Sequence, residues 1–310
     1  MRRLALALSY LVVPAALLAG CGTDTIQGLP TIAESRGHGG ESLDDATFTY
    51  TTIDVPGAVL TVAQGINARG DIVGFYNDAA RRRHGFLLRD GEFTTIDYPG
   101  AAGTDVRGIG PAGDVVGGYW MPGEPPVNIH GYKLTKHGDF ERVDYPGHIN
   151  TIPQRILPDG TILGCRHDQD MHGSMYGIVI ARSGNSEIDE PMSMNNGATP
   201  DGGRITGLYT SMTGRTEGYV IEDGVFTPFM VPASNFTAAW DMNPAGEIAG
   251  VYRDASARFH GFLRRGDTYA TLDVPGATAT RAFGINAGGD VVGSFVVGGR
   301  TRAFLATRDR

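Results

Sequence analysis

The sequence predicts an all-β protein, a six-bladed β-propeller closed by its own N-terminal strand. A unit of about 40–47 residues recurs from residue 48 to the C-terminus, a period typical of propeller blades. Each unit holds four short β-type runs separated by turns rich in Gly, Pro and Asn, and no segment has a helical stripe. A β-solenoid and a sandwich are the alternatives, but a solenoid repeats at a shorter period and a sandwich needs no repeat.

The first twenty residues precede the repeats and have the pattern of an export signal. Arg2 and Arg3 are followed by an apolar run, Leu4–Leu18, that is too short for a stable transmembrane anchor. The run ends in Leu18–Ala19–Gly20–Cys21, which resembles the bacterial lipobox. That resemblance implies cleavage before Cys21 and lipidation of its thiol. The alternative is an ordinary signal peptide with a chance cysteine.

Residues 21–46 are predicted to be a flexible tether, and residues 47–310 the propeller. The tether is polar, rich in Gly, Ser, Thr, Asp and Glu, and without periodicity. We expect an exported protein that is lipid-anchored in the cell envelope. Gly22 stands where an aspartate retains many lipoproteins at the inner membrane, which favours the outer membrane. Periplasmic and surface exposure both remain open.

The charge balance excludes one class of partner. The 310 residues contain 26 Lys and Arg against 34 Asp and Glu, a net charge of −8, and the one basic run is Arg81–Arg83. Nucleic-acid binding therefore has no electrostatic basis. Cys165 is the only cysteine besides Cys21, so a lipidated chain has no intramolecular disulfide. The expected partners are the membrane, through the lipid, and a protein or glycan; we expect a monomer.

The repeat units begin near residues 48, 93, 140, 186, 226 and 269. Each unit has a proline after its first run, an inner strand that ends in a tight turn, and a next strand with a central glycine. After the outer run Tyr269–Asp273 the chain supplies only three more runs, whereas the first run, Phe48–Asp54, has the sequence of an outermost strand. We predict that it completes the sixth blade by pairing beside Thr301–Ala306.

The repeat resembles the HAF-type extracellular repeat of bacterial surface proteins. The resemblance rests on Gly65–Gly74 with His84–Leu87, and on Gly284–Asn286 with Gly293, and it covers residues 48–310. Only Ala303 keeps the alanine of the motif. Glycine replaces it in three copies, at Gly85, Gly131 and Gly261. The resemblance implies export and a repetitive β fold but no established chemistry, so it supplies no catalytic residue.

Three histidines begin third strands of the repeat: His84, His130 and His260. Strands lie ~4.8 Å apart, so equivalent positions this far from the axis are too distant from one another to share a metal ion. We expect each histidine to bind a turn of its own blade. The aspartates two residues before proline, among them Asp97 and Asp273, are expected turn acceptors.

One matched position on the innermost strands differs from blade to blade, whereas a purely structural position would tend to repeat. It is occupied by Gln64, Arg107, Gln154, Asn196, Trp240 and Phe283. A mixed ring of amides, one arginine and aromatics at the channel suits a small polar or sugar-like ligand. The alternative is an ordinary solvent-filled channel.

The third repeat departs furthest from the pattern. Its loop Arg166–His172 contains two histidines and two aspartates, and His148 follows Gly147 in a turn expected on the same face. The candidate metal ligands are His148, His167, Asp170 and His172, with Asp168 nearby. Such a set suits a divalent metal or acid–base chemistry, and it requires His148 and His172 to lie within about 8 Å. The alternative is a solvated polar loop.

These observations predict a lipid-anchored envelope propeller that serves as a binding or scaffold module for a protein, glycan or small ligand. The rival hypothesis is an enzyme, a metal-assisted hydrolase or carbohydrate lyase with its site on the loop face of blade three. The sequence lacks a phosphate loop, a nucleophile elbow and an HExxH helix, which favours binding over catalysis. A divalent metal is the only cofactor expected.

Overall fold

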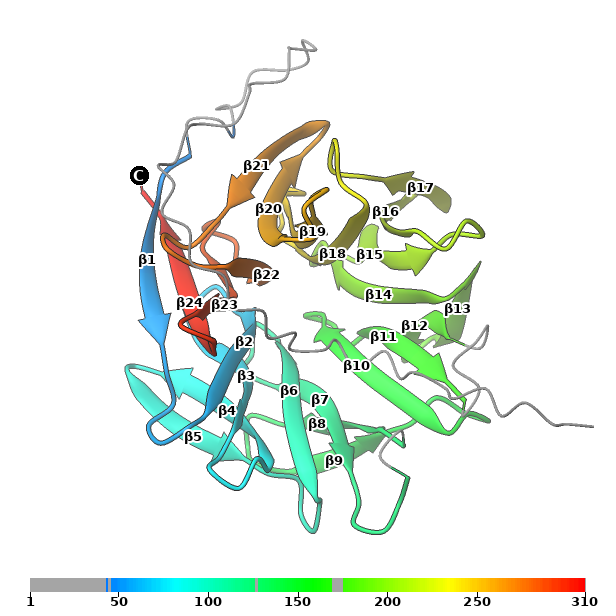
Figure 1. The fold of residues 1–310 in the computed structure, drawn as a ribbon. Helices are drawn as coiled ribbons and strands as arrows, with labels where there is room; N and C mark the ends of the chain where they lie inside the picture. The colour runs from blue at the N-terminus through cyan, green and yellow to red at the C-terminus, as the bar shows by residue number, and fades with distance from the viewer. Residues whose placement is uncertain (1–42, 44–45, 126–127, 169–174, 310) are drawn as a thin grey trace, which may run out of the picture. The chain divides into compact units, whose positions relative to one another are not determined.

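The computed structural model describes residues 43, 46–125, 128–168 and 175–309. Six antiparallel four-stranded sheets form the blades of a ring, as predicted (Figure 1). Blade one holds β2 (Leu60–Ile66), β3 (Ile72–Asn77), β4 (Arg83–Arg89) and β5 (Glu92–Ile96). Blade two holds β6 (Gly103–Ile109), β7 (Val115–Trp120), β8 (His130–Leu134) and β9 (Phe140–Val143). Blade three holds β10 (Asn150–Ile156), β11 (Ile162–His167), β12 (Tyr176–Ala181) and β13 (Gly184–Pro191).

The second half of the ring repeats this arrangement. Blade four holds β14 (Ser193–Ala198), β15 (Arg204–Thr210), β16 (Thr216–Glu222) and β17 (Val225–Phe229). Blade five holds β18 (Phe236–Met242), β19 (Ile248–Arg253), β20 (Phe259–Arg265) and β21 (Thr268–Leu272). Blade six holds β22 (Ala279–Ile285), β23 (Val291–Val297), β24 (Arg300–Arg308) and β1 (Phe48–Ile53). Within the described ranges, no helix is long and apolar enough to cross a membrane.

The N-terminal strand closes the ring, as the sequence predicted. β1 lies antiparallel beside β24 (Figure 1). The register of the pair places Ile53 opposite Ala303. Ile53 and Ala303 are both buried, and Tyr50 packs against the core of blade six. The two ends of the propeller are therefore joined by a complete strand ladder, in which β1 covers the edge of β24 that would otherwise be unpaired.

The ring has two faces, which we name by their connections. The inner strands β2, β6, β10, β14, β18 and β22 begin on the loop face and end at tight turns on the turn face. In the turn after β2, the Asn67 side chain accepts hydrogen bonds from the N–H groups of Arg69 and Asp71. Its amide also donates to the Asp71 carboxylate at 2.8 Å. The Asn and Asp of the HAF-like motif thus stabilise a turn.

The central glycine of each second strand is required by close packing. A Cβ atom at Gly74 would lie only 2.0 Å from the carbonyl oxygen of Val62 in the neighbouring strand. It would also lie 3.0 Å from the ring of Phe86, a fully buried residue of β4. Glycine is needed here because the inner strand approaches the second strand too closely for any side chain.

A buried threonine near the start of the inner strand holds the turn that leads into most blades. In blade one, Thr61 Oγ1 accepts a hydrogen bond from the N–H of Val55, just before Pro56. The same contact recurs in four other blades, at Thr104, Thr151, Thr237 and Thr280. In each of these turns, the threonine hydroxyl accepts a hydrogen bond from a backbone N–H group that has no partner in a neighbouring strand of the described chain.

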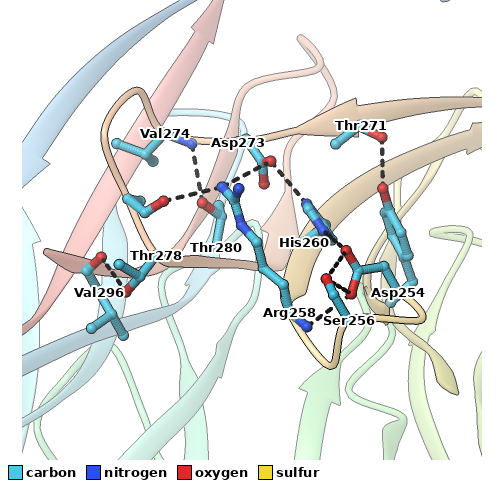
Figure 2. Close-up of polar contacts among 12 residues, drawn as sticks. Asp254, Ser256, Arg258, His260, Thr271, Asp273, Val274, Thr278, Thr280 and Val296 are labelled. Carbon is cyan, nitrogen blue, oxygen red and sulfur yellow. Dashed lines mark hydrogen bonds and ion pairs between the residues drawn. The ribbon is translucent and has the colours of Figure 1, made fainter. Parts of the chain in front are cut away.

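The histidines bind turns of their own blades, as predicted. Figure 2 shows His260 between two carboxylates: its Nδ1 lies 2.8 Å from Asp273 and its Nε2 3.2 Å from Asp254. The imidazole also stacks on Tyr252 at 4.8 Å. His84 repeats the arrangement in blade one. The hydrogen bond that His260 donates to the Asp273 carboxylate raises the pKa of His260. Protonated His260 therefore ties two connections of blade five together.

This arrangement predicts a pH-dependent contribution to stability. A raised pKa in the folded state means that the contribution is complete below the ordinary histidine pKa of 6.5 and is lost as pH rises through the folded-state pKa. We expect His260→Gln to lower the free energy of unfolding by about 1.5–3 kcal/mol at low pH. Urea unfolding across a pH series measures the difference between wild type and variant, which should shrink towards high pH. His137→Gln, at an exposed histidine, is the control; a difference that grows with pH would contradict the prediction.

Candidate functional site

Every inner strand has a β-bulge, and the bulged residue is the one at the variable position singled out in the sequence. In β2 the register shifts between Ala63 and Gly65, so that Gln64 is the extra residue. The corresponding residues of the other blades are Arg107, Gln154, Asn196, Trp240 and Phe283. The structure therefore brings the six residues of the predicted ring to one level of the propeller axis.

The axis at this level is filled by a side chain from blade three. Arg155 is only 7% exposed, and its Nη1 donates to the carbonyl oxygens of Arg107 at 2.8 Å and Gln154 at 2.7 Å. Its Nη2 donates to the carbonyl oxygens of Phe283 at 2.6 Å and Gln64 at 3.1 Å. Main-chain groups of the bulges, rather than their side chains, thus contact the centre of the ring.

Asp241 of blade five is the counter-ion of Arg155. Its Oδ1 lies 3.1 Å from Arg155 Nε, and the carboxylate also accepts hydrogen bonds from the N–H groups of Met242 and Ile285. Burial raises the pKa of Asp241, and the guanidinium opposes that rise. The other four blades have glycine at the position of Arg155 and Asp241, namely Gly65, Gly108, Gly197 and Gly284. The sequence analysis did not identify this pair, although the break in the glycine pattern could have revealed it.

The three amides of the predicted ring are buried between blades. Gln154 and Asn196 are fully buried and Gln64 is 7% exposed. Asn196 donates to the carbonyl oxygen of Ala239 at 2.7 Å, which links blade four to blade five. The structure differs here from the expected channel-lining ring, because Arg155 fills the axis and the amides pack beside it.

Trp240 and Phe283 belong to a half-exposed group on the loop-face side of Arg155. We define the aromatic–arginine cluster as Phe75, Phe236, Trp240, Phe259, Phe283, Arg83, Arg253 and Arg281. The rings come from blades one, five and six and surround buried Val62 and Val251. Trp240 and Phe283 meet edge to face at 5.2 Å, a favoured aromatic geometry. Except for Phe283, each of these rings remains partly exposed.

Arginines lie against the rings of this cluster. The guanidinium of Arg83 is 4.1 Å from the ring centre of Phe75, and that of Arg281 is 4.4 Å from the ring centre of Phe259. Arg253 lies 5.9 Å from the same Phe259 ring. These distances are within the range of cation–π attraction. Flat apolar surfaces with adjacent hydrogen-bond donors thus lie around the axis on this face.

A small pocket opens on the opposite side of Arg155, towards the turn face. It has a volume of about 130 Å³, with Arg155 and Asp241 among its lining residues. The ends of the inner strands supply apolar walls, for example Ile66, Ile156 and Met242. Both Nη atoms of Arg155 already donate to carbonyl oxygens, so the guanidinium has little capacity left for a ligand here.

The loops of blade three bring some of the predicted metal ligands together. His148 Nδ1 lies 3.1 Å from Asp168, and its Nε2 is 3.9 Å from Glu187. Arg166 bonds Glu187 at 2.6 Å and lowers the pKa of that carboxyl. His167 is buried, which lowers its pKa.

Two of the predicted metal ligands, Asp170 and His172, lie outside the described residues, so the approach of His148 to His172 stays a prediction. Among the residues with described positions, no three His, Cys, Asp or Glu side chains form a metal-binding group. The divalent metal likewise stays a prediction.

No family model and no curated protein matches the sequence, so the HAF resemblance and the lipoprotein signal stay predictions. Solved structures match the fold. TolB from Acinetobacter baumannii has a TM-score of 0.54 at 15% identity, covering 82% of this chain and 65% of that one. A gluconolactonase from Xanthomonas campestris has a TM-score of 0.53 at 13% identity, covering 86% and 91%. The Aleuria aurantia lectin has a TM-score of 0.51 at 10% identity, covering 84% and 97%. At these identities the likeness establishes the propeller fold alone.

The Arg155–Asp241 pair is open to a double-mutant test. Removing one partner leaves a buried charge unpaired, so Arg155→Gly and Asp241→Gly should each lower the free energy of unfolding by about 3–5 kcal/mol. The double variant restores the glycine found in the other four blades, and it should lose much less than the sum of the single losses. Urea unfolding measures all four proteins. Additive losses would show that the two side chains are not coupled.

Proposed function

We propose that the protein is an exported, lipid-anchored binding module that holds a glycan at the aromatic–arginine cluster. The single observation that carries this proposal is the group of partly exposed rings with arginines beside them, gathered around the axis on the loop face. Aromatic residues and arginine are the residue types most enriched at binding hot spots.

The chemistry of the cluster suits a sugar ring. A pyranose has an apolar C–H face, which packs on a flat aromatic ring, and a rim of hydroxyl groups, which accept hydrogen bonds from guanidinium groups. Trp240 supplies such a ring, and Phe75 and Phe259 supply two more. The guanidinium of Arg83 lies against Phe75, and that of Arg281 lies against Phe259. The Aleuria aurantia lectin, which shares the fold, was solved with a fucosylated disaccharide. The lectin is thus an example of a similar fold that binds a sugar. The proposal that this protein binds a glycan depends on the aromatic–arginine cluster itself.

Blade three supports a second candidate, the hydrolase or lyase expected as the rival. His148 lies between the carboxylates of Asp168 and Glu187 on the loop face, and a histidine held by carboxylates is an arrangement used in general acid–base catalysis. An activity screen on polysaccharides with wild type and His148→Gln tests this candidate. Activity that disappears in the variant would favour the enzyme over the binding module.

The binding proposal predicts a specific loss at the cluster. Trp240→Leu keeps an apolar side chain but removes the flat ring, and it should weaken glycan binding about tenfold or more. A glycan array followed by calorimetry with the purified full chain identifies the ligand and measures its affinity. Phe226→Leu removes a partly buried ring from β17, in the outer strand of blade four, and should leave the affinity unchanged. Equal affinities in wild type and Trp240→Leu would refute the proposal.

Lipid anchoring predicts a second outcome. Cys21→Ser removes the thiol that would be acylated, so the variant should leave the membrane fraction and appear in the soluble fraction. Fractionation and mass measurement of the N-terminal peptide check this. A variant that stays with the membrane, together with a wild-type peptide that carries no lipid, would overturn the lipobox assignment.

A further inference from the structure

Arg281 breaks the repeat at a second position of the inner strands. It lies in β22, two residues before the bulged Phe283, on the loop-face side of Arg155. Four of the five other blades have an apolar residue at the matched position: Val62, Ile152, Met194 and Ala238. The fold therefore does not require a charge here, and an apolar side chain is what the repeat normally supplies.

The fifth equivalent, Asp105 of blade two, shows how the fold treats a charge at this position. Arg107 lies 3.1 Å and Arg83 3.6 Å from its carboxylate, and the N–H of Gly118 also donates to it. Arg155 is likewise paired with Asp241. These inner-strand charges are thus matched by partners within the protein.

Arg281 has no such partner. Across the described part of the chain, neither an ion pair nor a hydrogen bond joins its side chain to another residue. Its close contact is the Phe259 ring at 4.4 Å, and burial lowers the pKa of Arg281 without any opposing carboxylate. Partial burial of an unpaired cation opposes stability, and the ring offsets only part of that cost. The residue is better suited to bind an anion from outside.

A second guanidinium lies against the same ring. Arg253 is 5.9 Å from the centre of Phe259, and its Nε donates to Asn235 at 2.8 Å. The nearest acid in sequence, Asp254, is already bonded to Ser256 and His260. Figure 2 shows that Asp254 points towards His260 within blade five. Two cations therefore flank one half-exposed ring where no described carboxylate pairs with either of them.

We propose that Arg281, assisted by Arg253, is the anion subsite of the glycan site and that the ligand is an acidic sugar, a uronate. The inference rests on the proposed function. A guanidinium binds a carboxylate through two parallel hydrogen bonds. The Phe259 ring beside it packs against the apolar face of the same sugar. A uronate has its carboxylate attached directly to the ring, so one residue of such a glycan satisfies both contacts.

The test compares two probes that differ only in charge, a trigalacturonate and its fully methyl-esterified form. Wild-type full chain should bind the acid about ten- to a hundredfold more tightly than the ester. Arg281→Met, which introduces the residue found at the matched position of blade four, should remove that preference, so that the acid and the ester bind with equal affinity. Arg281→Lys keeps the charge and should retain part of the preference. Arg182→Gln, at an exposed arginine on the turn face, is the control and should bind like wild type.

The outcomes separate this inference from the proposed function. Equal affinity of wild type for acid and ester, or an unchanged preference in Arg281→Met, would overturn the uronate assignment. If glycan binding is lost in Trp240→Leu in the same experiments, the proposed glycan site is still supported and only the uronate assignment fails. Tighter binding of a glutamate-rich peptide than of trigalacturonate would also overturn it, because an acidic protein would then be the ligand. Thermal unfolding of Arg281→Met should match or exceed that of wild type, since an unpaired cation is removed.

Discussion

The structure depends on the guanidinium group of Arg155 at the centre of the ring. A propeller needs only neighbouring blades to pack, and its axis is commonly the least constrained region. Here one side chain bonds main-chain carbonyls of blades one, two, three and six and pairs with Asp241 of blade five. Asn196 of blade four bonds the carbonyl of Ala239 in blade five. All six inner strands are therefore connected by polar contacts that form only when the ring is closed.

The same group divides the axis into two unlike regions. Towards the turn face, the small pocket has apolar walls, and the donors at its base are already used. Towards the loop face, the rings of the aromatic–arginine cluster other than Phe283 remain partly exposed, and Arg281 has no ion-pair or hydrogen-bond partner among the described residues. A ligand gains little from donors that already have acceptors, and more from a cation that has no carboxylate partner within the protein. The loop face is thus the side on which binding chemistry is concentrated.

The sequence predicted the scaffold well because the scaffold repeats. Blade number, closure by β1 and the turn-binding role of His260 all follow from residues that recur at one period. The Arg155 centre was not predicted, because a β-bulge changes which atoms face the axis, and no single-sequence pattern marks the extra residue as a bulge. The six variable positions are the bulged residues of the six inner strands. Their amide side chains nevertheless lie between blades, and only the aromatic members reach the half-exposed cluster.

Repetition also shows which charges belong to the fold. A side chain that serves the scaffold has an internal partner, as Asp71 has in Asn67 and Asp241 has in Arg155. A residue that departs from the repeat and has no such partner lowers stability, so the fold alone gives no reason to keep it. Arg281 meets both conditions, whereas His148 departs from the repeat but is paired with Asp168. A residue that differs from the repeat is therefore a stronger binding candidate when it also lacks an ion-pair or hydrogen-bond partner. This criterion favours Arg281 near the axis over His148 in blade three.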